Sequence, residues 1–213
     1  MAVDLPDEVP ITGRFVVVDD YEIRGGGIVR ETLPDSQAAA RDRVLLRNYK
    51  WESSFIPPEE RAERYNQHPT LLLITGERDV DRKRVAKELE ARLFAEGRMV
   101  YFLGIANVLY GVDADLGRAR EDRTEHMRRL AEVANLMLDA GIILIVTAIE
   151  LTREDLDLIT TSVDAERIRT VWVGQHVTTN VAVDLQLEPS EDLVQGVDQL
   201  ERLLQEAGAI QRG

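Results

Sequence analysis

The chain has 213 residues, enough for one domain with an appendage or for two small domains. Hydrophobic residues make up 44% and charged residues 31%, which is typical of a folded protein rather than a disordered one. There is no cysteine, which excludes disulfides, thiolate metal sites and a cysteine nucleophile. The net charge of −13 repels phosphate backbones and anionic headgroups, so we expect neither a nucleic acid nor a membrane as a partner.

The N-terminal sequence lacks the basic start and the apolar run of a signal peptide. The longest uncharged apolar run, residues 140–149, is half as long as a membrane helix needs to be. We therefore expect a cytoplasmic protein. The three histidines are widely spaced, so a histidine-rich metal centre is not expected either.

Residues 1–32 are expected to form a small β-hairpin. Residues 14–18 and 22–29 have the pattern of two short strands, with a turn at Asp19-Asp20 and a bulge or tight bend at the triple glycine. So short a segment cannot close a barrel or a sandwich by itself. Its apolar face must therefore dock on the rest of the chain or pair with a second copy, and the residues of that face are Phe15, Val17, Ile23, Ile28 and Val29.

Residues 33–68 are predicted to be a connector, and residues 69–213 an α/β domain. The connector contains an arginine-rich stretch and a short helix that begins at Pro57-Pro58. In the domain, short apolar stretches alternate with helical ones, which predicts a parallel sheet with helices on both faces. The predicted strands are 71–74, 99–103, 142–148, 171–173 and 181–187, and the predicted helices are 81–96, 121–140 and 192–207.

The loop after the first of these strands is where such a fold binds phosphate. A phosphate-binding loop reads G-x-x-x-x-G-K-[ST], and here only Gly76 fits it. Asp81 replaces the second glycine, Arg82 the lysine, and Lys83 the hydroxyl residue that holds magnesium, with Arg84 next. Asp81 puts a carboxylate where glycine lets backbone N–H groups point at phosphate. The three basic residues are either a weak anion site or, in the interpretation we favour, a solvated face.

Residues 69–213 resemble an adenylylsulfate kinase. That family carries a D-G-D-N-x-R-x-G-L-N-x-D-L-G block and a D-R-x-E-N-I-R-R-x-G-E-V-A-K-L-x-x-D-A-G block, and residues 101–117 and 121–149 match them in register. The resemblance implies a P-loop-kinase fold, with ATP and magnesium as the cofactors of an active member. The matching residues are Asn107, Gly111, Asp115-Leu116-Gly117, Asp122-Arg123, Glu125, Arg128-Arg129, Glu132-Val133-Ala134 and Asp139-Ala140-Gly141.

Residues 13–29 resemble a second kind of protein. They are similar to the last strands of the GTPase subunit of sulfate adenylyltransferase, an elongation-factor-like protein that is fused to the kinase in some organisms. The chain thus resembles the C-terminal part of such a fusion, with residues 1–32 as the end of a barrel domain. The resemblance implies a GTPase or adenylyltransferase domain as a partner.

Several departures from the family pattern bear on activity. The family's D-G-D is Gly104-Ile105-Ala106, which removes the carboxylate expected near the transferred phosphoryl group and its metal. Only residues 174–180 separate the last two predicted strands, so the basic lid of the family is expected to be absent. Because phosphoryl transfer depends almost wholly on positioning and electrostatic stabilisation, these losses together imply an inactive kinase. Further departures are Leu109, Arg118, His126 and Ile149-Glu150-Leu151, which replace an arginine, an aromatic residue, an asparagine and an I-S-P.

Three residues keep the family's positions near the sulfonucleotide pocket: Asn107, Arg123 and Arg129. Asn107 is expected to turn or cap the chain after the second strand of the domain. The two arginines are either remnants of an anion pocket or partners in ion pairs along a helix. The expected carboxylate partners are Glu121, Glu125 and Glu132.

Other polar and aromatic residues have plainer interpretations. Asp113 and Asp115 resemble a pair of metal ligands, but the loop lacks further ligands, so a solvated turn is favoured. His126 has no second histidine nearby and is expected to be structural. Trp51 and Trp172 are expected to be core or docking residues.

The sequence favours a catalytically degenerate adenylylsulfate-kinase-like domain, a structural or regulatory module of a sulfate-activating protein. We expect no catalytic residue, no metal and no cofactor, and either a homodimer or association with a GTPase or adenylyltransferase domain. One alternative is a residual kinase that uses ATP and magnesium to convert adenylylsulfate to PAPS. Another is a sensor that binds a nucleotide or sulfonucleotide without turnover.

Overall fold

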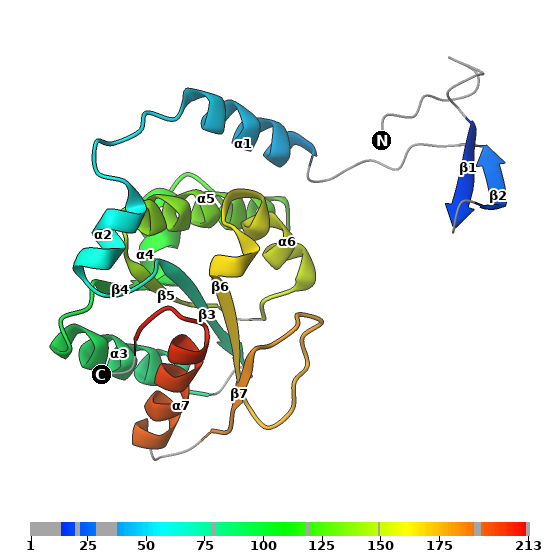
Figure 1. Ribbon diagram of the computed structural model, residues 1–213. Coiled ribbons are helices and arrows are strands. Elements are labelled where there is room, and N and C mark those ends of the chain that lie inside the picture. Colours follow the sequence, from blue (N-terminus) through cyan, green and yellow to red (C-terminus); the bar gives the residue numbers. More distant parts are fainter. Residues whose placement is uncertain are drawn as a thin grey trace. The chain divides into compact units, whose positions relative to one another are not determined.

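The computed structural model describes residues 14–19, 22–28, 38–77, 80–117, 120–148, 150–189 and 193–211. The chain forms two compact units, Met1–Ala39 and Ala40–Gly213 (Figure 1). The finer division expected from the sequence, with boundaries after residues 32 and 68, stays a prediction. Among the described residues, no helix is long and apolar enough to cross a membrane.

The described part of the first unit is an antiparallel hairpin of β1 (Arg14–Asp19) and β2 (Glu22–Ile28). The register shifts between Val17 and Val18, next to the triple glycine, where the sequence predicted a bulge. The side chains of Val16, Val18, Ile23 and Ile28 are exposed. Parts of the prediction lie outside the described residues, namely Asp20 of the turn, Val29, and the side chains of Phe15 and Val17.

The second unit is built on a parallel sheet, as predicted. The described residues form five strands in the order β4-β5-β3-β6-β7, and every neighbouring pair is parallel. β3 lies at the centre and is buried over its whole length, which accounts for its uninterrupted apolar sequence. The strands are β3 (Thr70–Gly76), β4 (Val100–Gly104), β5 (Ile143–Thr147), β6 (Ile168–Val173) and β7 (Leu185–Leu187).

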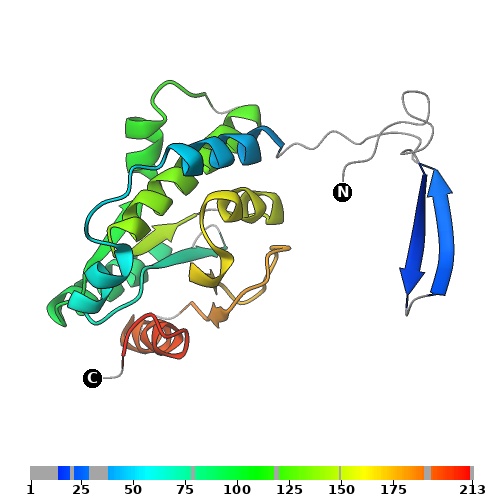
Figure 2. The same ribbon diagram turned by 45° about the horizontal axis from the view of Figure 1, so that its top comes forward.

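Helices cover both faces of this sheet (Figures 1 and 2). α3 (Arg82–Ala95) and α7 (Leu193–Glu206) pack on the face that carries Leu72 and Ile74. α5 (Arg120–Asp139) and α6 (Arg153–Ser162) pack on the opposite face. The remaining elements are α1 (Ala38–Lys50), α2 (Pro58–Arg64), the short α4 (Ile105–Asn107), the π-helical turn η1 (Val108–Val112) and the 3₁₀ turn η2 (Ala165–Arg167).

The last strand is shorter than predicted, and two longer helices, α1 and α6, were not predicted. Residues 181–187 were expected to form a strand, but only Leu185–Leu187 pair with β6. The carboxylate of Asp184 accepts hydrogen bonds from the backbone N–H and the hydroxyl of Thr170, at 2.6 and 2.9 Å. A side chain thus binds the backbone N–H of this β6 residue. α6 was not predicted, although Thr152 and Asp155 form a capping box at its start.

Candidate functional site

The candidate site lies where the parallel strands end, at the edge where ligand-binding loops of such sheets meet. β3 ends there at Gly76, which follows the backbone of β6 closely. A Cβ atom at Gly76 would lie 2.0 Å from the carbonyl oxygen of Val173, and the next N–H, that of Glu77, donates to the same oxygen at 3.0 Å. Glycine is therefore required at position 76 by strand packing alone.

The start of α3 is capped by a carboxylate of the chain itself. Asp81 is the N-cap residue, and its Oδ1 accepts a hydrogen bond from the backbone N–H of Arg84 at 3.1 Å. An anion is favoured at this end of a helix, because unpaired N–H groups and the helix dipole meet there. Asp81 supplies that anion, and its φ of −83° is one that any residue adopts without strain.

The basic residues of the loop do not form one solvated face, so that expectation was wrong for Arg82. Only 7% of Arg82 is exposed, and its Nη1 donates to the carbonyl oxygen of Glu77. Burial lowers the pKa of Arg82, but a guanidinium group keeps its charge in proteins. Lys83 and Arg84 are exposed, as predicted. Arg78 and Asp79 lie outside the described residues.

The connection from β6 to β7 folds onto the neighbouring loops. It spans residues 174–184, longer than the 174–180 expected, because β7 starts later. The backbone N–H of His176 donates to Glu77 Oε1 at 3.0 Å, and the Thr179 hydroxyl donates to the Leu151 carbonyl at 2.6 Å. The connection contains no arginine or lysine.

A cleft of about 720 Å³ opens beside the capped start of α3. Its walls come from α3, the end of β7 and the first turns of α7, and they mix apolar side chains with amides and charges. Asp81 and Arg84 lie on its rim next to the loop. The lining residues are Val80, Asp81, Arg84, Val85, Val173, Gln186, Leu187, Glu188, Pro189, Leu193, Gln195, Gly196 and Gln199.

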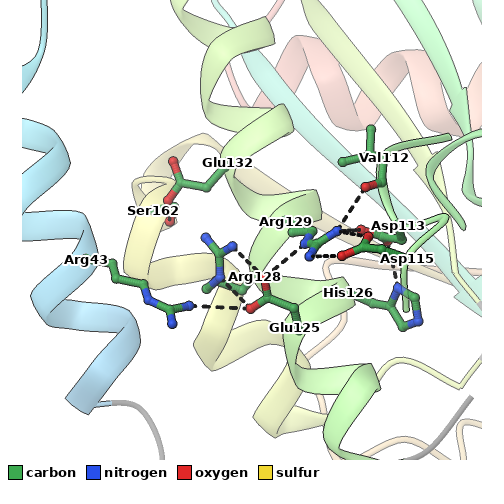
Figure 3. Close-up of polar contacts among 10 residues, drawn as sticks. All are labelled: Arg43, Val112, Asp113, Asp115, Glu125, His126, Arg128, Arg129, Glu132 and Ser162. Carbon is green, nitrogen blue, oxygen red and sulfur yellow. Dashed lines mark hydrogen bonds and ion pairs between the residues drawn. The ribbon is translucent and has the colours of Figure 1, made fainter. Parts of the chain in front are cut away.

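Arg129 is held by carboxylates on both sides (Figure 3). It donates to Asp115 at 2.5 Å, to Glu125 at 2.9 Å and to the Val112 carbonyl at 3.0 Å. The hydrogen bond from Arg129 lowers the pKa of Asp115 to about 2. The hydrogen bonds from Arg128, the larger effect, and from Arg129 lower the pKa of Glu125 to about 2. The expected ion pair between Arg129 and Glu125 is confirmed.

Arg123 is held by a carboxylate that the sequence did not indicate. It donates to both oxygens of Asp155, at 3.0 and 2.6 Å, and to the Glu150 carbonyl at 3.0 Å. Asp155 is 4% exposed and also accepts from the backbone and hydroxyl of Thr152. Burial raises the pKa of Asp155, but the bonds from Arg123 and Thr152 outweigh it, so that the pKa lies below its ordinary value.

The remaining predicted residues lie on both sides of this network. Asn107 is exposed and ends α4, directly after β4, where the chain was expected to turn. The solvated turn expected at Asp113 and Asp115 is right for Asp115, whose side chain is 64% exposed, and wrong for Asp113, which is 0% exposed. The buried carboxylate of Asp113 is compensated by His126, whose Nδ1 lies 2.7 Å from its Oδ2. Trp172 is buried in the core, as expected.

The comparison with known proteins identifies the family. The family model for adenylylsulphate kinase matches residues 68–188. The chain belongs to the adenylylsulfate kinase family. An adenylyl-sulfate kinase of Shewanella baltica (strain OS155) is 36% identical over 144 residues, which are 68% of this chain and 68% of that protein.

Further relatives of the adenylylsulfate kinase family include a longer protein and solved structures. The bifunctional enzyme NodQ of Rhizobium meliloti (strain 1021) is 35% identical over 157 residues, 73% of this chain but only 23% of NodQ. The Cys556Ala mutant of the Mycobacterium tuberculosis APS kinase CysC has a TM-score of 0.57 at 27% identity, covering 65% of this chain and 99% of that one. A hexameric APS kinase from Thiobacillus denitrificans shares the fold, with a TM-score of 0.59 at 19% identity over 70% of this chain and 31% of that one.

Adenylylsulfate kinases use magnesium with ATP, and the residues described do not fit that ion. Magnesium prefers carboxylate and hydroxyl oxygens in octahedral geometry. The hydroxyl position of the phosphate loop is the exposed Lys83, a cation that supplies no oxygen ligand. Thr147 ends β5 with a buried hydroxyl without a hydrogen-bond partner, but a single neutral oxygen does not make a magnesium site.

Replacing Asp155 by asparagine is expected to destabilise the fold by about 1–3 kcal/mol, because Arg123 loses its carboxylate and α6 part of its cap. The lowered pKa of folded Asp155 means that this stabilisation is present above the unfolded value of 3.8 and is lost as the pH falls through the folded value. Urea unfolding of the wild type and of Asp155→Asn between pH 7 and pH 3 measures the difference in their free energies of unfolding. This difference should become smaller as the pH falls.

The matched control is Asp157→Asn on the same helix, where the ion pair with Arg153 is exposed. It should change the free energy of unfolding by less than about 0.5 kcal/mol. Equal stabilities of Asp155→Asn and the wild type at pH 7 would contradict the structural role given to the Arg123–Asp155 pair.

Proposed function

We propose that this chain is a catalytically degenerate member of the adenylylsulfate kinase family and acts as a structural or regulatory module of a sulfate-activating protein. The observation that carries the proposal lies at the phosphate loop. Asp81 caps α3 with its own carboxylate, and the Arg82 guanidinium is bonded to the carbonyl of Glu77. Both groups occupy interactions that a phosphate-binding loop leaves to its ligand.

The electrostatics of the loop support this proposal. Phosphate binding at a helix start needs N–H groups that point at the ligand and a positive end of the helix. Here one of those N–H groups donates to Asp81, and the charges of Asp81 and Glu77 would face an incoming triphosphate. Because phosphoryl transfer relies on positioning and charge stabilisation, a loop of this composition gives little of either.

The two family arginines support the same conclusion. A sulfonucleotide would have to compete for Arg123 with Asp155, and for Arg129 with Asp115 and Glu125. Hydrogen bonds between charged groups are stronger than those between neutral groups, and the intramolecular partners are already in place. The candidate anion pocket of Asn107, Arg123 and Arg129 is thus occupied by the chain's own carboxylates at both arginines.

A larger assembly is the natural setting for such a module. NodQ is a bifunctional enzyme, and this chain spans about a quarter of its length. The described hairpin in the first unit has two strands with exposed apolar side chains, and a hairpin of two strands is marginal on its own. We therefore propose a cytoplasmic protein that forms a homodimer or associates with a GTPase or adenylyltransferase domain.

The second candidate function is a sensor that binds a nucleotide or sulfonucleotide without turnover. The observation in its favour is the cleft of about 720 Å³ beside the start of α3, which is large enough for a small molecule. Its lining combines apolar walls with amide side chains, such as Gln195 and Gln199. A measurement of binding separates the sensor from the module, and a measurement of turnover separates both from a residual kinase.

The first prediction from the degenerate-kinase proposal concerns turnover. We expect no ATP-dependent phosphorylation of adenylylsulfate above the uncatalysed background, because phosphate and metal ligands are missing together. The triple variant Asp81→Gly, Arg82→Lys, Lys83→Ser restores the loop motif but not the lid or the lost carboxylate, so we expect weak ATP binding at most and no catalysis. Turnover by the wild type that is proportional to protein and abolished by chelating magnesium would establish a residual kinase.

The second prediction concerns ATP binding. A ligand present at 100 times its dissociation constant stabilises a protein by about 2.7 kcal/mol. For a chain of this size that corresponds to a rise in melting temperature of about 5–10 °C. We expect a shift near zero at millimolar Mg-ATP, with adenylylsulfate as a second probe. A large shift without turnover would favour the sensor over the module.

The third prediction concerns the hairpin. Deleting residues 1–32 is expected to lower the melting temperature or the mass seen by light scattering, because the apolar hairpin face loses its partner surface. In the full chain, Val16→Lys with Ile28→Lys should act in the same direction, whereas Glu22→Lys alters charge on the same hairpin without touching an apolar residue. If neither the deletion nor the double variant changed stability or mass, the assembly proposal would be wrong.

A further inference from the structure

His126 lies between two hydrogen-bond acceptors of one short segment, residues 113–117, which precedes α5. Its Nδ1 is 2.7 Å from Oδ2 of Asp113, and its Nε2 is 3.1 Å from the carbonyl oxygen of Gly117. The histidine belongs to α5 and points toward Asp113 (Figure 3). Its side chain is only 12% exposed. The imidazole thus joins both ends of the segment to the helix.

This arrangement needs a proton on each ring nitrogen. The carbonyl oxygen of Gly117 can only accept, so Nε2 must donate. A proton must also lie between Nδ1 and the buried carboxylate of Asp113. A neutral imidazole paired with a carboxylate has one N–H and one lone pair, so one of the two contacts is lost when the proton leaves.

The charges around His126 come from two elements. In the segment 113–117, Asp113 is fully buried and Asp115 is exposed. On α5, Asp122 lies one turn before His126 with its carboxylate against Gly117, and Arg129 lies one turn after it. Nη1 of Arg129 is 3.7 Å from Oδ1 of Asp113, an oxygen that has no hydrogen-bond partner. The carboxylates of Asp113 and Asp122 thus favour the imidazolium, and the guanidinium of Arg129 opposes it.

We propose that His126 is a pH-sensitive clamp, which in its protonated form fastens residues 113–117 to α5 and on losing its proton releases the Gly117 carbonyl. When the proton leaves, the buried Asp113 keeps the remaining N–H, because an unpaired buried carboxylate is the costlier loss. Nε2 then presents a lone pair to the Gly117 oxygen, which repels it. The end of the segment nearest to α5 is the part that opens.

The direction of the pH dependence follows from the same contacts. Burial lowers the pKa of His126, but the hydrogen bonds to Asp113 and Gly117 outweigh it, so the folded-state pKa lies above the ordinary value of 6.5. The stabilisation is therefore complete below about pH 6.5 and is lost as the pH rises through the folded-state pKa. The segment follows β4, α4 and η1, and its Asp115 binds Arg129, so the clamp acts next to the Arg129 network of the candidate site.

The experiment compares urea unfolding of the full chain with that of His126→Asn from pH 5.5 to pH 9. Asparagine stands at this position in the family pattern and cannot titrate. The folding equilibrium constant of the wild type should fall relative to that of the variant, tenfold for each pH unit between the unfolded and folded pKa values. The matched control His176→Asn changes an exposed histidine and should follow the wild type. Parallel curves for the wild type and His126→Asn would overturn the clamp.

A second measurement on the wild type covers the case in which His126→Asn does not fold. Imidazole ¹⁵N NMR, assigned among the three histidines through His68→Asn and His176→Asn, reports the protonation of each ring nitrogen. We expect both nitrogens of His126 to be protonated at pH 6, and amide exchange at residues 116–117 to speed up as the ring titrates above pH 6.5. A neutral His126 ring at pH 6, or amide exchange that ignores its titration, would contradict the proposal.

Discussion

A guanidinium group stays charged at every physiological pH, so each arginine that folds against the sheet of this protein must be given acceptors. Three of them lie around the carboxyl edge of the sheet, and all three obtain their acceptors from the same chain. Arg82 uses the Glu77 carbonyl, Arg123 the carboxylate of Asp155, and Arg129 two carboxylates. These pairs fix the start of α6 and the approach to α5, so the shape of the edge depends on how arginine charge is compensated.

Under the proposed function, the same pairs separate family membership from activity. The core that defines the fold consists of apolar strands and helix faces, and it tolerates change at the few polar positions that carry chemistry. Carboxylates and phosphates are acceptors of the same kind, so an edge that supplies its own carboxylates leaves fewer donors for a ligand. A chain can therefore match an enzyme family over most of a domain while the polar side chains at this edge stabilise the fold.

Much of the fold could be predicted because it depends on local patterns. β3 and β5 are continuous apolar runs, which are typical of strands buried on both faces. The long helical pattern of α5 is also clear in the sequence. α6 has only 10 residues, so its helical pattern covers fewer than three turns, although the capping box of Thr152 and Asp155 marks its start. β7 starts later than the predicted strand because the carboxylate of Asp184 binds Thr170 of the neighbouring strand.

The polar site was less predictable, because it depends on the direction of long side chains. The sequence pattern placed Arg82 at a helix start but could not show that it turns back to Glu77. The buried carboxylate of Asp113 has its partners, His126 and Arg129, on another element, α5. The partner of Arg123 was missed because Asp155 belongs to the unpredicted helix. Tertiary partners of this kind leave no periodic signal.

Gly76 bears on how such chains change over evolutionary time. Its missing Cβ is demanded by the carbonyl of Val173, whatever the loop beyond it binds. Packing alone would keep this glycine whether or not the loop binds phosphate, whereas Asp81 and Lys83 are exposed and meet no such packing demand. In degenerate relatives of kinases, a retained first glycine is then explained by the contact between two strands. Only the later positions of the loop indicate whether phosphate is still bound.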